Sequence, residues 1–288
     1  ALGTYVVEAK ILGKYIKENL ATKNVGILYQ TDDFGRNTVE GLTTAGVTFT
    51  AKKTAATFIA GTQAGGLDAQ MQQLKDNNVD VVIIGAVASA FATAVGSANK
   101  IGYKPQYIVI SVGSDATTFQ TILFTKGIPF ATSAALLAGT ISASHAPSPG
   151  EADDEFVKAF KKINDDFNKA TGSGKVWDNN VLQGMNIAYL ATSALMGVGK
   201  DLTRAKLVSY LKANGSKLSS AAFSPLGYSA STHEAFTGFW IGKYDAATVL
   251  KPIDSTRKVW TTDSAKGAVT ELKYTRPAIA ADALPKVG

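Results

Sequence analysis

Three stretches decide the fold: VGILYQTDDFGRN (25–37), VDVVIIGA (79–86) and YIVISVGSD (107–115). Each begins with a nearly continuous apolar run and ends in small or polar residues. Continuous apolar runs are typical of parallel strands that helices cover on both faces, and helical segments do separate these runs. The pattern predicts an α/β fold around a parallel sheet. Such sheets bind ligands beyond the carboxyl ends of their strands, which directs the search for a site.

Helical spacing predicts helices at 4–20, 33–45, 67–78 and 89–100, with a further strand near 47–55. In the first helix the apolar residues share one face, and we expect the Lys and Glu residues mostly on the other. Asp33 is a candidate N-cap for the second helix, and Gly46 can end that helix in the left-handed conformation.

The pattern changes after Ile128. Residues 131–144 suggest a strand that leaves the first domain, and helices follow at 151–170 and 181–198. Asp201 or Thr203 can cap a third helix that runs to Ala213. No strand is predicted between these helices, so a sheet from elsewhere should cover them. Extended, turn-rich sequence returns at 223–253, and two lobes are expected, with crossings near 132–146 and 218–228.

Composition limits the classes of function. The 288 residues are 45% hydrophobic, which favours two domains. A net charge of +6 comes from 29 scattered Lys and Arg, so a solvated basic surface is favoured over a nucleic-acid site. The absence of cysteine excludes disulfides and cysteine-ligated zinc, and no ligand cluster for another metal is seen. No signal peptide opens the chain and no apolar run approaches the length of a membrane-spanning helix.

Enzymatic motifs are not found in the sequence. His145 and His233 are isolated in turn-rich segments, and no G-x-S-x-G nucleophile elbow accompanies them. The first strand is followed by QTDDFGR, which is neither a dinucleotide fingerprint nor a phosphate-binding loop with its lysine. Asp32 and Asp33 are adjacent and point in different directions. We therefore predict a protein that is not an enzyme and needs no cofactor.

Several motifs, in this order and spacing, resemble one family: the type I periplasmic solute-binding proteins of ABC importers, in the branched-chain amino-acid receptor class. The motifs are E-x-x-x-L-G-K-Y-I at 8–16, Y-x-x-D-x-F-G at 29–35, L-x-x-N-x-V-D-V-V-I-I-G at 74–85, A-N-K-I-G-Y-K-P at 98–105, G-K-D-L-T-R-A-K-L at 199–207, and Y-S-x-S-T-H-x-A-F-T-G at 228–238. The resemblance implies a two-lobed α/β fold with doubly wound parallel sheets joined by crossover strands.

The resemblance also implies a function. The chain would be an extracytoplasmic receptor, periplasmic or a cell-surface lipoprotein, that is monomeric and delivers a ligand from an interlobe cleft to an ABC permease. The ligand would be an amino acid or an amino-acid-like or aromatic acid. A ligand-sensing regulatory domain of the same fold is the alternative.

The resemblance further implies that an N-terminal half-sheet should precede the first helix. At ~30 residues per βαβ unit, we expect a segment of about 100 residues that this sequence does not contain. The expected division is residues 1–131 for the ligand-binding lobe, 132–222 for the helical part of the other lobe, and 223–288 for the return and the tail.

The resemblance indicates Phe34, where the family places an aromatic residue that covers the ligand; packing onto its own helix is the alternative role. Val87 and Ala88 stand where receptors for branched-chain amino acids tend to carry another aromatic residue, which implies a wider pocket. The family often has a carboxylate after the fourth strand. Asp115 could serve, or it could cap the helix at 116–123. Ser111 and Ser114 can each donate or accept a hydrogen bond there.

Overall fold

The computed structural model describes residues 3–279, which form two compact units. Unit 2 comprises Tyr5–Ser144 and Trp240–Thr270. The described part of unit 1 comprises residues 3–4, 145–239 and 271–279.

The elements of the two units are as follows. Unit 2 contains the helices α1 (Tyr5–Asn19), α2 (Asp33–Thr44), α3 (Asp68–Asp76), α4 (Ala88–Lys100), α5 (Ala116–Thr125) and α6 (Phe130–Leu137). Unit 1 contains α7 (Glu155–Thr171), α8 (Asn179–Val198) and α9 (Arg204–Asn214). The strands are β1 (Val25–Gln30), β2 (Ala55–Phe58), β3 (Val81–Gly85), β4 (Gln106–Val109), β5 (Ile141–Ser144), β6 (Gly238–Tyr244), β7 (Leu250–Pro252), β8 (Val259–Thr261) and β9 (Thr270–Leu272). Short 3-10 helices are η1 (Gln63–Gly65), η2 (Ser111–Gly113) and η3 (Gly215–Lys217).

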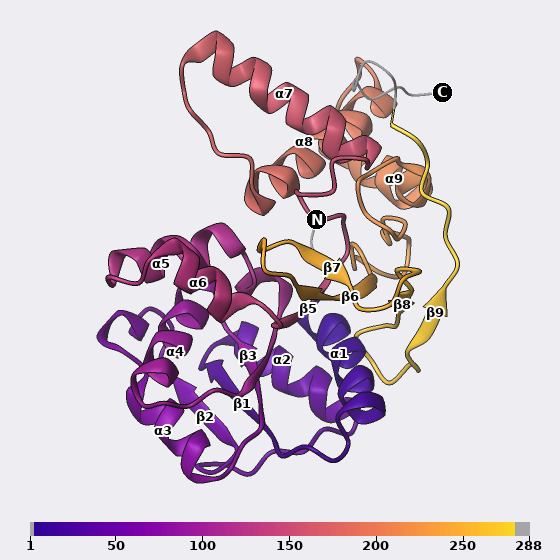
Figure 1. The fold of residues 1–288 in the computed structure, drawn as a ribbon. Coiled ribbons are helices and arrows are strands. Elements are labelled where there is room, and N and C mark those ends of the chain that lie inside the picture. The colour runs from indigo at the N-terminus through magenta and orange to yellow at the C-terminus, as the bar shows by residue number, and fades with distance from the viewer. Residues whose placement is uncertain (1–2, 280–288) are drawn as a thin grey trace. The chain divides into compact units, whose positions relative to one another are not determined.

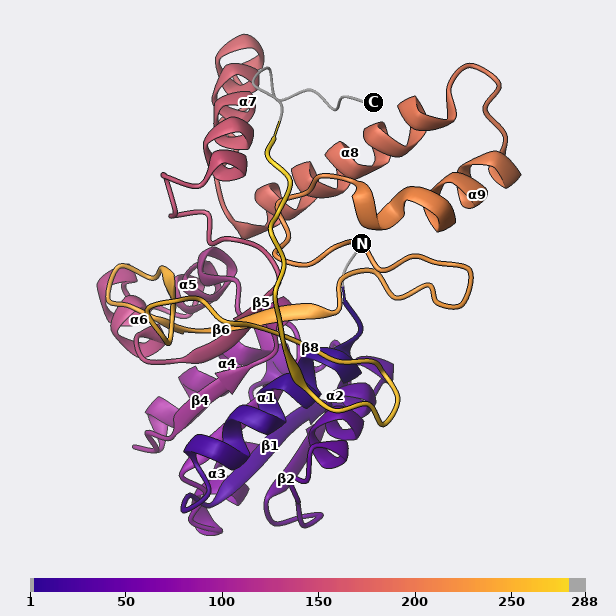
Figure 2. The same cartoon turned by 90° about the vertical axis from the view of Figure 1, so that its right-hand side faces the viewer.

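The strands form one sheet in the order β2-β1-β3-β4-β5-β6-β8-β9, with β7 paired to β6. β1 to β5 run parallel, as the apolar runs predicted, and β6 is antiparallel to β5. The helices α1 and α2 lie on one face of the sheet and α3, α4 and α5 on the other, and Figures 1 and 2 show this arrangement. The winding direction reverses between β1 and β3, which is the topological switch point.

Several expected elements shift. The second strand, expected at 47–55, is β2 at Ala55–Phe58, where Ile27 and Leu28 of β1 pair with Ala55 and Ala56. The strand expected across 131–144 is instead α6 followed by the short β5. The run FATSAALL forms a helix because its small residues tolerate helical packing, and its Ser133 and Leu137 are buried.

The unit boundaries differ from the expected divisions after 131 and after 222. β5 pairs with β4, which keeps residues 132–144 in unit 2. Residues 223–239 lie in unit 1, where Leu226 and Phe236 pack with Leu190 of α8. Sequence cannot locate these changes, because both follow from which neighbours a segment packs against.

The α1 helix departs from the expectation that its charged residues lie on the solvent face. Glu8 and Lys10 are both only 2% exposed. Lys10 Nζ donates to the carbonyl oxygens of Asp263, Ala265 and Gly267 and pairs with the Asp263 carboxylate at 3.1 Å. The lysine thus ties α1 to the segment after β8, a long-range contact that a helical pattern does not encode.

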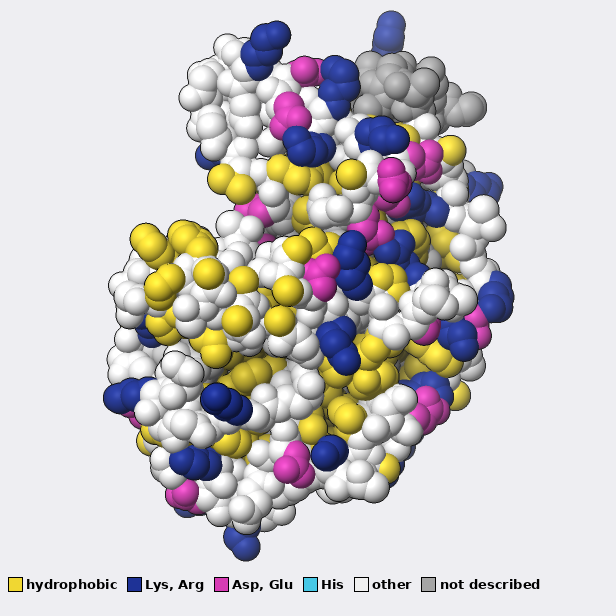
Figure 3. Space-filling view, viewed as in Figure 1, with side chains coloured by type: hydrophobic (Ala, Val, Ile, Leu, Met, Phe, Trp, Pro, Cys, Tyr) yellow, Lys and Arg dark blue, Asp and Glu magenta, His cyan; other side chains and the backbone are white. Residues whose placement is uncertain are grey.

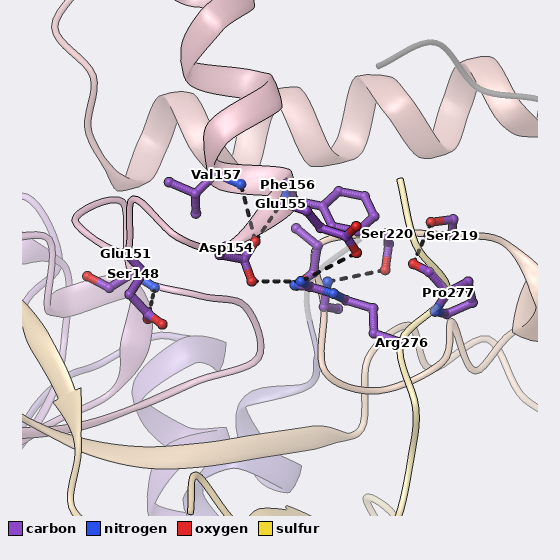
Figure 4. Close-up of polar contacts among 12 residues, drawn as sticks. Ser148, Glu151, Asp154, Glu155, Phe156, Val157, Ser219, Ser220, Arg276 and Pro277 are labelled. Carbon is purple, nitrogen blue, oxygen red and sulfur yellow. Dashed lines mark hydrogen bonds and ion pairs between the residues drawn. The ribbon is translucent and has the colours of Figure 1, made fainter. Parts of the chain in front are cut away.

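Unit 1 has its own apolar core. Phe156 and Phe160 of α7 and Tyr189 of α8 contact one another through their rings and are buried. Asp154 caps α7 by accepting the N–H groups of Phe156 and Val157. Figure 4 shows Arg276 from the C-terminal segment reaching the same carboxylate.

The outer faces of these helices are less covered. Because no strand was predicted to cover these helices, their apolar residues were expected to be poorly covered: Phe156, Phe160, Ile163, Val181, Met185 and Tyr189. Of these only Ile163 is exposed, at 42%; Val181 and Met185 are partly buried and the other three are buried. The α8 helix is long and apolar enough to span a membrane by length and composition, which differs from the sequence-based expectation. One such helix is weak support for a membrane span, because core helices share this composition.

Unit 2 also carries an uncovered apolar surface. Phe124 of α5 and Phe130 of α6 stack with their ring centroids 4.9 Å apart and are both about half exposed. Figure 3 shows apolar side chains gathered over these two helices.

Candidate functional site

A single side chain joins the end of β1 to the end of β3. Gln30 is the last residue of β1, it is buried, and its Oε1 accepts the backbone N–H of Val87 at 3.2 Å. Its Nε2 donates to Asp32 Oδ2 at 2.6 Å. Because β1 and β3 flank the switch point, these bonds organise the edge where doubly wound sheets bind ligands.

The turn after β1 is built around Asp32 and Gly35. Asp32, rather than the expected Asp33, caps α2, since its Oδ1 accepts the N–H of Gly35 at 3.1 Å. Asp33 is the first helical residue and pairs with Arg36 at 2.6 Å. A Cβ on Gly35 would lie 1.9 Å from the backbone oxygen of Gln30, so only glycine permits this close approach.

This turn places Phe34 at the start of α2. Its ring stacks on Tyr5 of α1, with centroids 4.0 Å apart and an interplanar angle of 24°. Phe34 is 8% exposed and packs on α1, whereas the alternative role was packing onto its own helix, α2. Its contact with a ligand stays a prediction.

The edge beyond β3 is made of small residues. Val87 is the residue that precedes α4 and is half-buried, and Ala88 is the first residue of the helix and is 7% exposed. The N-terminus of α4 therefore approaches this edge without a large side chain. That the pocket is wider at this point stays a prediction.

The predicted residues after β4 gather in one turn. Ser111 begins the 3-10 helix η2, and Ser114 Oγ donates to the carbonyl oxygen of Ser111 at 2.9 Å. Asp115 caps α5 by accepting the N–H of Thr118 at 2.7 Å, which is one of its two expected roles. A Cβ on Gly113 would lie 2.2 Å from the oxygen of Ala86, so the turn packs directly on the chain that leaves β3.

A buried carboxylate holds this turn from the other side. Glu8 Oε1 accepts the N–H of Ser111 at 2.6 Å, and Glu8 Oε2 lies 2.8 Å from Ser111 Oγ. Burial raises the pKa of the Glu8 carboxyl to about 7, and the two bonds from Ser111 oppose that rise. Tyr244 of β6 donates to the carbonyl oxygen of Ser114 and fixes the far end of the turn.

The structure thus brings Val87 and Ala88 beside the Ser111–Asp115 turn and places Phe34 at the start of α2, just beyond the end of β1. Sequence reasoning missed Gln30 and Glu8. Gln30 had a signal, because it is the one polar residue that ends an otherwise apolar strand. Glu8 had none, since its partner is 103 residues away. Within residues 3–279, no group of three His, Asp or Glu side chains could hold a metal ion.

Comparisons with known proteins give the fold independently. A substrate-binding periplasmic protein from Ralstonia solanacearum matches with a TM-score of 0.70 and 16% identity, over 88% of this chain and 67% of that one. A fatty acid ABC transporter substrate-binding protein from Thermomonospora curvata matches with a TM-score of 0.68 and 17% identity, over 96% of this chain and 67% of that one. A branched-chain amino acid ABC transporter protein from Thermus thermophilus, solved with bound valine, matches with a TM-score of 0.65 and 14% identity, over 90% of this chain and 66% of that one.

At these identities the likeness establishes the fold alone. The chain spans about two thirds of these structures and 65% of another, from Rhodopirellula baltica SH 1. Among curated proteins, no sequence match was found.

A family model described as "periplasmic binding protein" matches residues 2–248. Proteins of this family bind small molecules outside the cytoplasm and are not enzymes, as the sequence predicted. The words "ABC transporter" stand in the descriptions of the Thermomonospora curvata and Thermus thermophilus structures. The matched span and the doubly wound sheet agree, and the chain therefore belongs to the periplasmic binding protein family, with the type I fold.

Proposed function

We propose that this protein is a solute-binding receptor of an ABC importer that captures a small organic molecule and delivers it to a membrane permease. The observation that carries the proposal is the site at the switch point. There, Gln30 bridges two strand ends, and a stacked aromatic pair and a hydroxyl-bearing turn stand on either side.

The site favours a ligand with both apolar and polar parts. The rings of Phe34 and Tyr5 can cover an apolar group. Ser111 and Asp115 offer polar contacts, which suits an amino acid or an amino-acid-like or aromatic acid. In this proposal unit 2 is the ligand-binding lobe.

The receptor is further proposed to be monomeric and to reside in the periplasm or on the cell surface as a lipoprotein. Light scattering of the purified protein tests the first point, since a dimeric mass would refute it. Co-purification with a membrane-embedded permease tests transport. A soluble signalling partner instead would favour the ligand-sensing alternative.

Native mass spectrometry of the protein as purified is the most direct test of ligand binding. A bound mass that is lost on denaturation would identify the class of ligand. A chain with no bound mass that also shows no binding to a panel of amino acids, aromatic acids and fatty acids would contradict the proposal.

The variant Phe34→Ala is expected to weaken binding by roughly 1 to 3 kcal/mol, because the ring would no longer exclude water from the ligand. Titration calorimetry with a ligand from that panel measures the loss. Phe124→Ala is the matched control, since Phe124 is exposed on α5 away from the strand ends. Unchanged affinity in folded Phe34→Ala would assign Phe34 to packing alone.

A further inference from the structure

The Glu8 carboxylate makes two bonds to one residue of the candidate site. One oxygen accepts the Ser111 N–H at 2.6 Å, and the other lies 2.8 Å from the Ser111 hydroxyl oxygen. Glu8 is 2% exposed, whereas Ser111 is half-buried. The carboxyl group is therefore shielded from solvent, and its partner is the residue that can reach a ligand.

The direction of the second bond depends on one proton. An ionised carboxylate only accepts, so the Ser111 O–H must point at Glu8, and its oxygen lone pairs remain for a ligand. When the carboxyl takes up a proton from solvent, its O–H can donate to Ser111 Oγ. The O–H of Ser111 keeps its proton but no longer points at Glu8, so it can turn and donate to a ligand. The N–H bond to the other Glu8 oxygen persists in both states.

We propose that the protonation state of Glu8 decides whether Ser111 accepts a hydrogen bond from the ligand or donates one to it. Ser111 is an acceptor when Glu8 is ionised and a donor when Glu8 is protonated. Glu8 is in this sense a positioning residue that tunes specificity. The inference rests on the proposed function, because it takes Ser111 as a ligand contact. It selects ligand groups by chemistry, with ammonium groups favoured in the ionised state and carboxylate or carbonyl groups in the protonated state.

The burial that shields Glu8 raises its pKa to about 7, so both states are populated near neutral pH. The ionisable groups nearest the Glu8 carboxyl come from several elements. Tyr5 and Lys10 lie on α1, Asp32 on the turn after β1, Asp115 at the start of α5 and Tyr244 on β6. Lys10 is held by Asp263, and the phenols of Tyr5 and Tyr244 have raised pKa values and stay neutral over this range.

Two variants separate the roles. Glu8→Gln keeps the shape, because its Oε1 can accept the Ser111 N–H while its Nε2 donates to Ser111 Oγ. This variant should hold Ser111 as a donor at every pH. Ser111→Ala removes the hydroxyl and with it both preferences, which makes it the matched control.

The experiment uses the whole chain and two probes that each carry one end of a branched amino acid, isobutylamine and isovalerate. Neither probe titrates between about pH 6 and about pH 8. In the wild type the ratio of affinities, amine over carboxylate, should rise about 10-fold across this range, the effect of one reversed hydrogen bond. The ratio should be flat in Glu8→Gln and in Ser111→Ala.

The amide resonance of Ser111, followed by NMR without a probe, reports on the coupling alone. It should titrate near neutral pH in the wild type and not in Glu8→Gln. A wild-type resonance that does not titrate, or an affinity ratio that does not change with pH, overturns the inference. If neither probe binds while Ser111 titrates as expected, the ligand contact of Ser111 is refuted and the fault lies in the proposed site, not in its coupling to Glu8.

Discussion

Replacing Arg276 with methionine is expected to lower the free energy of unfolding by about 3 to 5 kcal/mol, the usual cost of removing one partner of a buried ion pair. Arg276 Nη2 lies 2.6 Å from Asp154 Oδ2, and the exposed fractions of the two side chains are only 12% and 9%. Figure 4 shows the guanidinium directed at the N-terminus of α7. Its loss would leave the Asp154 carboxylate buried without a counter-charge.

The guanidinium has further contacts that methionine cannot replace. It lies over the rings of Phe156 and Phe223, at 4.6 and 5.0 Å from their centroids, and donates to the carbonyl oxygen of Ala221 at 3.0 Å. Together these contacts tie the C-terminal segment to the core of unit 1.

Urea unfolding measures the effect. Lys273→Met is the control on the same segment, because Lys273 is exposed and pairs with nearby Glu271. It should change stability by less than about 1 kcal/mol. A double-mutant cycle with Asp154→Asn isolates the pair. Equal stability of Arg276→Met and the control would show that Arg276 does not anchor the segment.

His145 is expected to make the protein less stable in acid. Burial lowers the pKa of His145 to about 4, and the hydrogen bond between His145 Nε2 and Gln183 Oε1 at 3.1 Å only partly opposes this. The ring stacks on Phe236 and meets Phe239 edge-on, so a charged imidazole would sit between aromatic rings. An unfolded histidine, in contrast, takes up a proton near its ordinary pKa of 6.5.

The sign follows from that difference. Between about pH 6.5 and about pH 4 the unfolded chain binds a proton that folded His145 refuses, so stability is lost as pH falls through this window. The shift corresponds to about 3 kcal/mol. Glu8 acts in the opposite sense, because its pKa is raised, and its contribution is lost as pH rises toward 7. The two trends offset each other in the wild type.

The comparison is therefore made between variants. From neutral pH to pH 4, His145→Gln should lose about 3 kcal/mol less unfolding free energy than the wild type. His233→Gln is the matched control, since His233, the other histidine of the chain, is exposed. Parallel pH profiles for the wild type and His145→Gln, measured by denaturant unfolding, would show that His145 is charged or solvated in the folded protein.

The sequence by itself determined the local elements and the kind of fold. The apolar runs at β1, β3 and β4 predicted parallel strands, and Gly46, with a φ of 85°, ends the turn after α2 as expected. Asp115 and Thr203 could be recognised as caps because capping involves residues only a few positions apart. The predicted site residues at strand ends followed from the same logic, since parallel strands share one carboxyl edge.

The tertiary structure alone decided which distant groups meet. Glu8 and Lys10 look like solvent-facing helix residues, yet burial against Ser111 and the segment after β8 gives them partners 103 and 253 positions away. Arg276 and Asp154 are likewise 122 residues apart, in a tail with weak periodicity. Periodicity records which face of an element is apolar, but a buried charge breaks that pattern and is stable only because a specific partner compensates it. That partner is set by the packing of whole elements, and no local pattern contains it.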